Sequence, residues 1–189
     1  LMDCIIEVFS EKYHTHRDFL YTAGIDDKLV LALDDLINAL PDHDIRGKKI
    51  LDLGCGSTGS TYESNFMNEN RQFEPWVSRA LLELGAVITG IDVGKLNNER
   101  FEHFNIDLAK ENSLAFIQNE SYDVVLALAF YDSPELLQRT HHFEMIEVKN
   151  ILRPQIGRVL KSNGVYLEDR TIYTKRNLTS GVKRAFTQI

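Results

Sequence analysis

Residues 50–60, ILDLGCGSTGS, join a strand-like apolar run to three glycines and an acid. Gly54, Gly56 and Gly59 have G-x-G-x-x-G spacing, which lets backbone N–H groups approach a ligand closely because no Cβ intervenes. Asp52 lies two residues before the first glycine, at the end of the apolar run. This combination predicts a loop that binds a cofactor through its backbone, with a carboxylate close by.

Two further acids lie at the ends of later apolar runs. Asp92 follows the run AVITGI, and Asp107 follows FNI and precedes Leu108. A carboxylate in the position of Asp92 can accept hydrogen bonds from both hydroxyls of a ribose. The Asp107 carboxylate can accept a hydrogen bond from an adenine amino group, while Leu108 packs on the ring. These acids therefore predict an adenosine-containing ligand.

The chemistry of Asp52 separates the candidate cofactors. From the glycines alone, NAD, FAD and S-adenosylmethionine are equal candidates, and Asp92 fits the ribose of each. A carboxylate aimed at the pyrophosphate of a dinucleotide is repelled by it. A sulfonium cofactor that also carries an ammonium group tolerates such an acid or uses it. Asp52 and the Asp107–Leu108 pair favour S-adenosylmethionine, and an NAD(P)-dependent oxidoreductase is kept as an alternative.

The elements that must position these residues follow from the hydrophobic periodicity. Short apolar runs predict strands over residues 49–53, 86–92, 104–107, 122–129 and 164–168. Helical periodicity predicts helices over residues 29–40, 75–84, 114–119 and 144–160, the last interrupted or kinked near Pro154. The alternation predicts an α/β fold, a Rossmann-like doubly wound and mostly parallel sheet of about five strands with helices on both faces.

The domain organisation is expected to be simple. Residues 1–45 form a helical N-terminal segment that covers the main fold, and residues 46–189 form one compact Rossmann-like domain. Only nineteen residues follow Arg170. They leave room for a short extension or one more helix.

Five segments resemble, in order, the successive motifs of the class I S-adenosylmethionine-dependent methyltransferases: ILDLGCGSTG, GAVITGIDVG, FNIDLA, SYDVVLALAF and IGRVLKSNGVYL. The resemblance spans residues 48–167 and implies transfer of a methyl group from S-adenosylmethionine to an acceptor. It implies a role for each matched residue, by position. The methionine and sulfonium part would be lined by Asp52, Gly54, Cys55 and Gly56, the ribose held by Asp92, the adenine contacted by Val93, Asp107 and Leu108, and the ammonium group bound by the backbone carbonyl of Ala127.

Departures from the family pattern leave the acceptor open. The link over residues 60–74 is longer than usual before the next helix, so it is either a lid over the site or a surface loop, with Trp76 anchoring the helix. The sequence ALAFYDSP lacks the Asn-Pro-Pro-Tyr type of signature that marks methylation of amino groups in bases or glutamine. The last two strands typical of the family lack a counterpart. A non-catalytic, methyltransferase-like binding domain therefore stays as a second alternative.

Other polar side chains have a functional and a structural interpretation. Arg17 could pair with the methionine carboxylate or lie on a surface helix. His141 and His142 point to different sides of a helix, so with Glu144 they are not expected to share a metal ion, and no metal site is predicted. The carboxylates that follow the fourth and fifth strands could each act as a general base or cap the next turn: Asp132, Glu168 and Asp169.

Composition narrows the partners and the compartment. The net charge of −7 argues against broad binding of nucleic acid, so the expected methyl acceptor is a small molecule or a protein. The two cysteines, Cys4 and Cys55, lack metal-site spacing and are too few for a disulfide framework. The longest apolar run is too short to cross a bilayer. These features predict a cytoplasmic protein without a membrane role.

Overall fold

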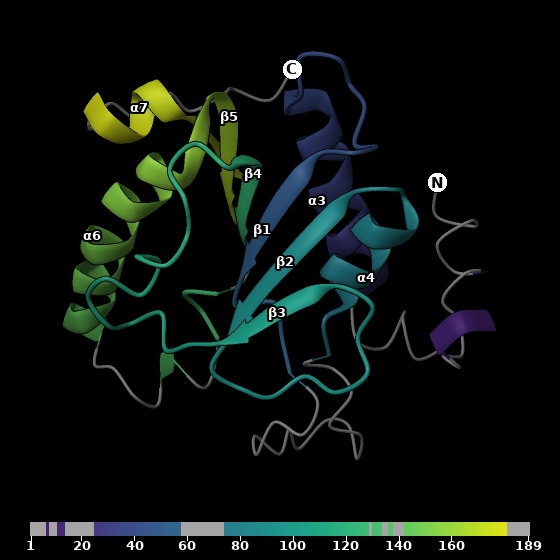
Figure 1. The fold of residues 1–189 in the computed structure, drawn as a ribbon, viewed down its shortest axis with the longest axis horizontal. Coiled ribbons are helices and arrows are strands. Elements are labelled where there is room, and N and C mark those ends of the chain that lie inside the picture. Colours follow the sequence, from purple (N-terminus) through teal and green to yellow (C-terminus); the bar gives the residue numbers. More distant parts are fainter. Residues whose placement is uncertain are drawn as a thin grey trace.

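The computed structural model describes residues 7, 11–13, 25–57, 74–128, 130–133, 136–137 and 142–180. Along the chain, the helices and strands are α3 (Ile25–Ala39), β1 (Lys49–Leu53), α4 (Trp76–Glu83), β2 (Val87–Asp92), β3 (Glu102–Asn105), β4 (Tyr122–Ala127), α6 (His142–Val159), β5 (Leu160–Glu168), β6 (Thr171–Thr174) and α7 (Lys175–Ser180) (Figure 1).

The strands form one six-stranded sheet in the order β3-β2-β1-β4-β5-β6. All neighbours are parallel except β5 and β6, which are antiparallel. The strand order reverses between β1 and β4, and in open α/β sheets ligands bind beyond the carboxyl ends of the strands at such a point. The predicted Rossmann-like, doubly wound fold is confirmed.

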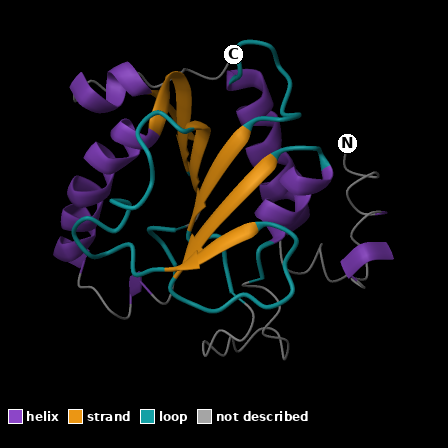
Figure 2. Cartoon of the chain, in the orientation of Figure 1, coloured by secondary structure: helices purple, strands orange, loops and turns teal. Residues whose placement is uncertain are grey.

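Helices cover both faces of the sheet, α3 and α4 on one and α6 on the other (Figure 2). Alternate residues of each central strand face opposite sides. Ile50 of β1 lies in the same core cluster as Leu36 of α3 and Leu81 of α4, whereas Leu51 lies in the other cluster with Leu152 of α6. Burial on both faces explains why the central strands have continuous apolar sequences.

Several predicted elements agree with the structure closely. The strand over residues 49–53 has the predicted bounds, and α4 lies within residues 75–84. The helix predicted over residues 144–160 is α6, but the interruption expected near Pro154 is wrong, because the helix continues through this residue. A proline inside a helix removes one backbone hydrogen bond. Here the burial of the surrounding α6 residues outweighs that loss.

The strand count and one helix were predicted wrongly. The sheet has six strands rather than about five, because Thr171–Thr174 pairs with β5 immediately after the turn at Asp169 and Arg170. A four-residue strand offers too short a pattern to detect, although its threonines and aromatic side chain suit a sheet. The segment over residues 114–119 forms turns, not a helix, and it buries Leu114 and Ile117 against α6.

The bounds of β3 and β5 also differ from the prediction. β3 lies at Glu102–Asn105, two residues earlier than residues 104–107, because it is a partly exposed edge strand without the apolar pattern of a central one. β5 begins at Leu160, directly after α6, rather than at residue 164. Its first half follows the helix without a loop, so no turn residue marks its beginning.

Most of residues 1–24 lie outside the described residues, among them Arg17, and so do residues 60–73. Of the N-terminal segment, Tyr13 packs edge-on against Trp76 of α4, with ring centroids 6.5 Å apart. The side chain of Lys12 forms an ion pair with Glu83 at the end of the same helix. None of the helices in the described ranges is long and apolar enough to cross a membrane.

Candidate cofactor site at the carboxyl ends of β1 and β2

The glycine loop after β1 turns over the end of β2. Gly54 and Gly56 have φ angles of +71° and +101°, in the left-handed region that glycine adopts without steric cost. The N–H groups of Gly54 and Cys55 both donate to the carbonyl of Ile91, at 2.8 and 3.2 Å. The loop is therefore fixed to the strand that carries Asp92. Gly59 lies outside the described residues.

Asp92 connects the loops that follow β1 and β2. Its Oδ2 accepts a hydrogen bond from Gly56 N–H at 3.0 Å, and its Oδ1 accepts one from Gly94 N–H at 2.8 Å. The two loops touch: a Cβ built on Gly94 would lie 2.2 Å from the Cβ of Ser57. The structure thus brings Asp92 and the glycine loop together at the edge where the sequence predicted a cofactor.

Asp52 is a buried carboxylate beneath this loop. Its side chain faces α4, is only 3% exposed and accepts a 2.6 Å hydrogen bond from Ser78 Oγ of that helix. No lysine or arginine among the described residues lies within ion-pair distance of it. The pKa of Asp52 is raised to about 6: burial raises it most, the hydrogen bond from Ser78 lowers it, and the charge of Asp92 raises it.

Cys55 lies within the negative potential of these acids. Burial raises the pKa of its thiol well above the ordinary value, and the charges of Asp52, Asp92 and Glu99 raise it further. The thiol therefore stays protonated at neutral pH and is not an activated nucleophile.

α4 also fixes the loop after β2, through Arg79. Its guanidinium pairs with Glu99 of that loop and with Glu74, which precedes the helix. The group also lies 4.7 Å from the ring centroids of both Tyr13 and Trp76. Neither Ser78 nor Arg79 was identified from the sequence, because no spacing along the chain relates them to the strand ends they contact.

The predicted adenine contacts have different surroundings. Asp107 Oδ1 accepts a hydrogen bond from Ala109 N–H at 3.1 Å, so this carboxylate caps the turn after β3. Leu108 is buried, whereas Val93 is 40% exposed. Asn105 Nδ2 donates to the carbonyls of Val93 and Gly94 and supports the loop after β2.

The residues after β4 and β5 are engaged in structural contacts. The carbonyl of Ala127, predicted to face the ammonium group, accepts a 3.2 Å hydrogen bond from Asp169 N–H. A carbonyl has two lone pairs, so one stays available for a ligand. After β4, the cap on Leu136 N–H comes from the hydroxyl of Ser133, so the cap expected from Asp132 is made by its neighbour.

Glu168 lies at the centre of an ion cluster between β5 and α6. Its carboxylate accepts hydrogen bonds from Lys149 Nζ at 2.7 Å, Arg153 Nη2 at 3.1 Å and Tyr166 Oη at 3.0 Å. Burial raises the pKa of Glu168, but the two cations outweigh burial, and the net pKa lies below the ordinary value. A carboxylate held in this way is not a poised general base.

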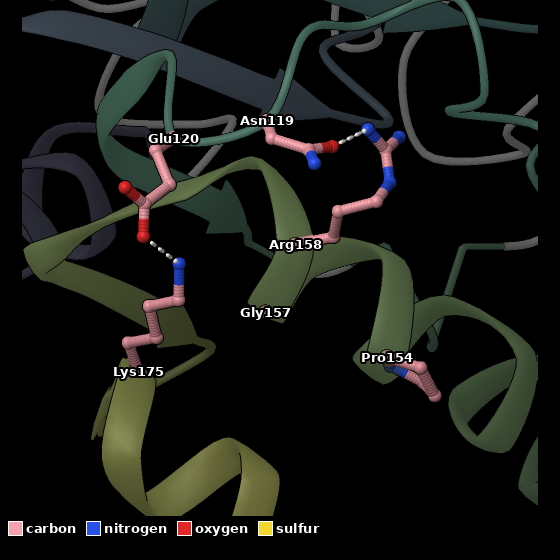
Figure 3. Close-up of a pocket in the computed structure, with 6 residues that line it drawn as sticks. All are labelled: Asn119, Glu120, Pro154, Gly157, Arg158 and Lys175. Atoms are coloured by element: carbon pink, nitrogen blue, oxygen red, sulfur yellow. Dashed lines mark hydrogen bonds and ion pairs between the residues drawn. The ribbon is translucent and has the colours of Figure 1, made fainter.

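A cavity of about 510 Å³ lies elsewhere, beside the amino ends of β4 and β5 (Figure 3). Its polar side chains are paired with one another: Glu120 with Lys175 at 2.8 Å, and Asn119 with Arg158 at 2.7 Å. Because the cavity lies at the amino ends of the strands, it is separate from the glycine loop, which lies at their carboxyl ends. Within the described ranges, no three His, Cys, Asp or Glu side chains are grouped to hold a metal ion.

Comparisons with known proteins give structural neighbours only. No protein-family model and no curated protein sequence matches the chain. It is similar to phosphoethanolamine N-methyltransferase 1 of Haemonchus contortus, solved with phosphoethanolamine and S-adenosylhomocysteine: 14% identity, TM-score 0.43, over 89% of this chain and 31% of that one. It is also similar to magnesium protoporphyrin IX methyltransferase of Synechocystis, solved with S-adenosylmethionine: 14% identity, TM-score 0.43, over 87% and 74%.

A third similar structure is the CurJ carbon methyltransferase, at 18% identity and a TM-score of 0.36, over 75% of this chain and 34% of that one. The chain thus spans about a third of the length of two of these neighbours. All three are methyltransferases, the class that the motifs resemble.

Proposed function

We propose that the chain is an S-adenosylmethionine-dependent methyltransferase domain whose cofactor site lies at the carboxyl ends of β1, β2 and β3. The observation that carries this proposal is Asp52, a buried carboxylate without a cationic partner in the described part of the chain. An unpaired buried charge is costly, and such groups gather at functional sites. A positively charged ligand above the glycine loop would compensate it.

Each part of the cofactor has a fitting group nearby. The glycine loop and Asp52 would face the methionine and sulfonium part, and Asp92, already fixed by Gly56 N–H, would accept the ribose hydroxyls. The adenine would lie toward Val93, Asp107 and Leu108, and the second lone pair of the Ala127 carbonyl would accept from the ammonium group.

The cofactor, when bound, supplies an activated methyl group for in-line attack by the acceptor. The protein's part is then to bind, orient and exclude water, which are the contributions that fixed backbone loops and buried acids make. The loops after β1 and β2 are already joined through Asp92, so this edge of the sheet is preorganised. We assign no general base, because Glu168 is held by Lys149 and Arg153.

A dinucleotide fits this site less well. Its pyrophosphate would need N–H groups of the glycine loop, but Gly56 N–H donates to Asp92. The pyrophosphate would also approach the charges of Asp52 and Asp92, which already raise the pKa of the Cys55 thiol.

The net charge of the chain bears on the methyl acceptor. A charge of −7 supports a small molecule or a protein, rather than nucleic acid, as the acceptor.

Isothermal titration calorimetry with S-adenosylmethionine, S-adenosylhomocysteine and NAD tests the proposal. We expect the two adenosyl ligands to bind with micromolar dissociation constants and NAD not to bind. Asp92→Ala should abolish binding of the adenosyl ligands. The control is Asp42→Ala: Asp42 is a surface carboxylate before β1 that pairs with Lys48, and its replacement should leave binding unchanged. Binding of NAD alone would favour an oxidoreductase. Cofactor binding without turnover on any acceptor would favour the non-catalytic alternative.

A further inference from the structure

Ser78 makes an unusual contact for a serine inside a helix. Serine hydroxyls in helices commonly bond back to a carbonyl of the preceding turn. Ser78 is fully buried on α4, and its Oγ instead donates across to Asp52 Oδ2 at 2.6 Å. The contact joins α4 to the end of β1, directly below the glycine loop.

Of the charged and titratable groups around Asp52, none stabilises its ionised form, and Ser78 is the group that does. From β2, Asp92 faces it with a like charge, and from the glycine loop Cys55 faces it with a protonated thiol. The adjacent cation on α4, Arg79, is paired with Glu74 and Glu99. The Ser78 hydroxyl is therefore the one group among the described residues that favours the ionised form of Asp52.

We propose that Ser78 is a positioning residue of the cofactor site: its hydroxyl keeps the Asp52 carboxylate ionised and fixed beneath the glycine loop, so that the site prefers the sulfonium cofactor to its neutral thioether product. This inference rests on the proposed function. It adds a physical reason for product release, because the attraction to Asp52 is lost when the methyl group and its positive charge leave.

Two ligands isolate the effect of the sulfonium charge on binding. S-adenosylmethionine and S-adenosylhomocysteine differ by one methyl group and one charge, so the ratio of their dissociation constants reports the charge preference of the site. A hydrogen bond to a carboxylate favours its charged form. Removing the Ser78 hydroxyl should therefore raise the pKa of Asp52 and weaken the preference for the sulfonium at neutral pH.

The experiment measures both dissociation constants by calorimetry between about pH 5 and pH 8.5. In the wild type, the preference for S-adenosylmethionine should grow as the pH rises through about 6, where Asp52 ionises. Ser78→Ala should move the midpoint of this pH dependence upward by about one unit, the effect of one hydrogen bond to a charged group, so the preference should fall about fivefold at pH 6 and about twofold at pH 7. Ser78→Thr, which keeps the hydroxyl, should restore it.

A matched control is Ser113→Ala. The Ser113 hydroxyl is also buried, but it has no hydrogen-bond partner within the described residues, so its removal should leave the preference unchanged. Asp52→Asn keeps the size of the side chain and should abolish both the preference and its pH dependence.

Two results would overturn the inference while the proposed function stands. One is equal weakening of both ligands by Ser78→Ala with an unchanged midpoint, which is what a purely structural serine would give. The other is an Asp52→Asn variant that retains the wild-type preference. If the wild type binds neither ligand, the proposed function itself fails.

Discussion

The carboxylate of Asp92 accepts the backbone N–H of Gly56 at 3.0 Å, which joins the end of β2 to the glycine loop of β1. The second oxygen of the same carboxylate holds Gly94 N–H, so one side chain fixes both loops at this edge of the sheet. An acid in this position therefore organises the candidate site before any ligand binds. The loops can stay in contact because Gly94 carries no Cβ.

Gly94→Ala should separate these loops. The new Cβ would lie 2.2 Å from the Cβ of Ser57, so one loop must move. We expect a loss of about 1–3 kcal/mol in the free energy of unfolding, measured by urea denaturation, which is typical of overpacking. Gly47→Ala, where no atom lies within 4 Å, should cost only the strain of a positive φ, about 1 kcal/mol. Equal stability of Gly94→Ala and the wild type would contradict the close contact of the loops.

Asp52→Asn should make the protein more stable at alkaline pH. The pKa of Asp52 is raised from 3.8 to about 6 in the folded state, so its ionisation opposes folding. The stability linked to its protonation is fully present below about pH 4 and is lost as the pH rises through about 6. The variant should gain up to about 3 kcal/mol at pH 8.

Urea unfolding of this variant at pH 4, 6 and 8 checks that prediction, with the wild type as reference. The difference in the free energy of unfolding between the variant and the wild type should shrink toward zero at pH 4. A variant that is less stable than the wild type at pH 8 would mean that the Asp52 charge is compensated within the chain, against the proposed role of a cationic ligand.

Replacing Arg79 should be far more costly than replacing an exposed arginine. Arg79→Met leaves the carboxylates of Glu74 and Glu99 without their cation, so we expect a loss of about 3–5 kcal/mol in the free energy of unfolding. Arg46→Met removes a fully exposed pair with Asp44 and should leave the free energy of unfolding almost unchanged. Similar losses in the two variants would show that the Arg79 cluster is not a buried network.

Glu168→Gln should destabilise the protein in a pH-dependent way. The pKa of Glu168 is lowered in the folded state by Lys149 and Arg153, so its contribution to stability is present above the unfolded pKa of about 4.5 and is lost as the pH falls through the folded pKa. At pH 7 the glutamine amide carries no charge, so the variant leaves two cations without their counter-charge and should lose about 2–3 kcal/mol in the free energy of unfolding. Thermal unfolding of the variant and the wild type at pH 7 and pH 3.5 measures this loss of stability. A loss of equal size at both pH values would contradict a contribution from the charge of Glu168.

The central strands were predictable because their burial on both faces leaves a local pattern. Ile50 and Leu51 contact opposite layers, and both must be apolar. The acids were predictable for a related reason: Asp52 and Asp92 follow such runs, and parallel strands end at one edge of the sheet. Two of the predicted ligand residues therefore lie together in the structure.

The rest depended on contacts between distant parts of the chain. Nothing near Ser78 in the sequence indicates that its hydroxyl meets a carboxylate 26 residues earlier. β6 exists because its backbone pairs with β5 after a tight turn, and the 114–119 segment gains burial against α6 without forming a helix. The bounds of β3 were not predictable because an edge strand is partly exposed and therefore lacks the continuous apolar pattern of a central strand.

The most direct test of the proposed site is a crystal structure of the protein with S-adenosylhomocysteine. The account predicts the ribose hydroxyls on the Asp92 carboxylate, the sulfur end above the glycine loop and Asp52, and the adenine beside Val93 and Leu108. A ligand found in the cavity beside Glu120 and Lys175, or one with its ribose away from Asp92, would contradict it.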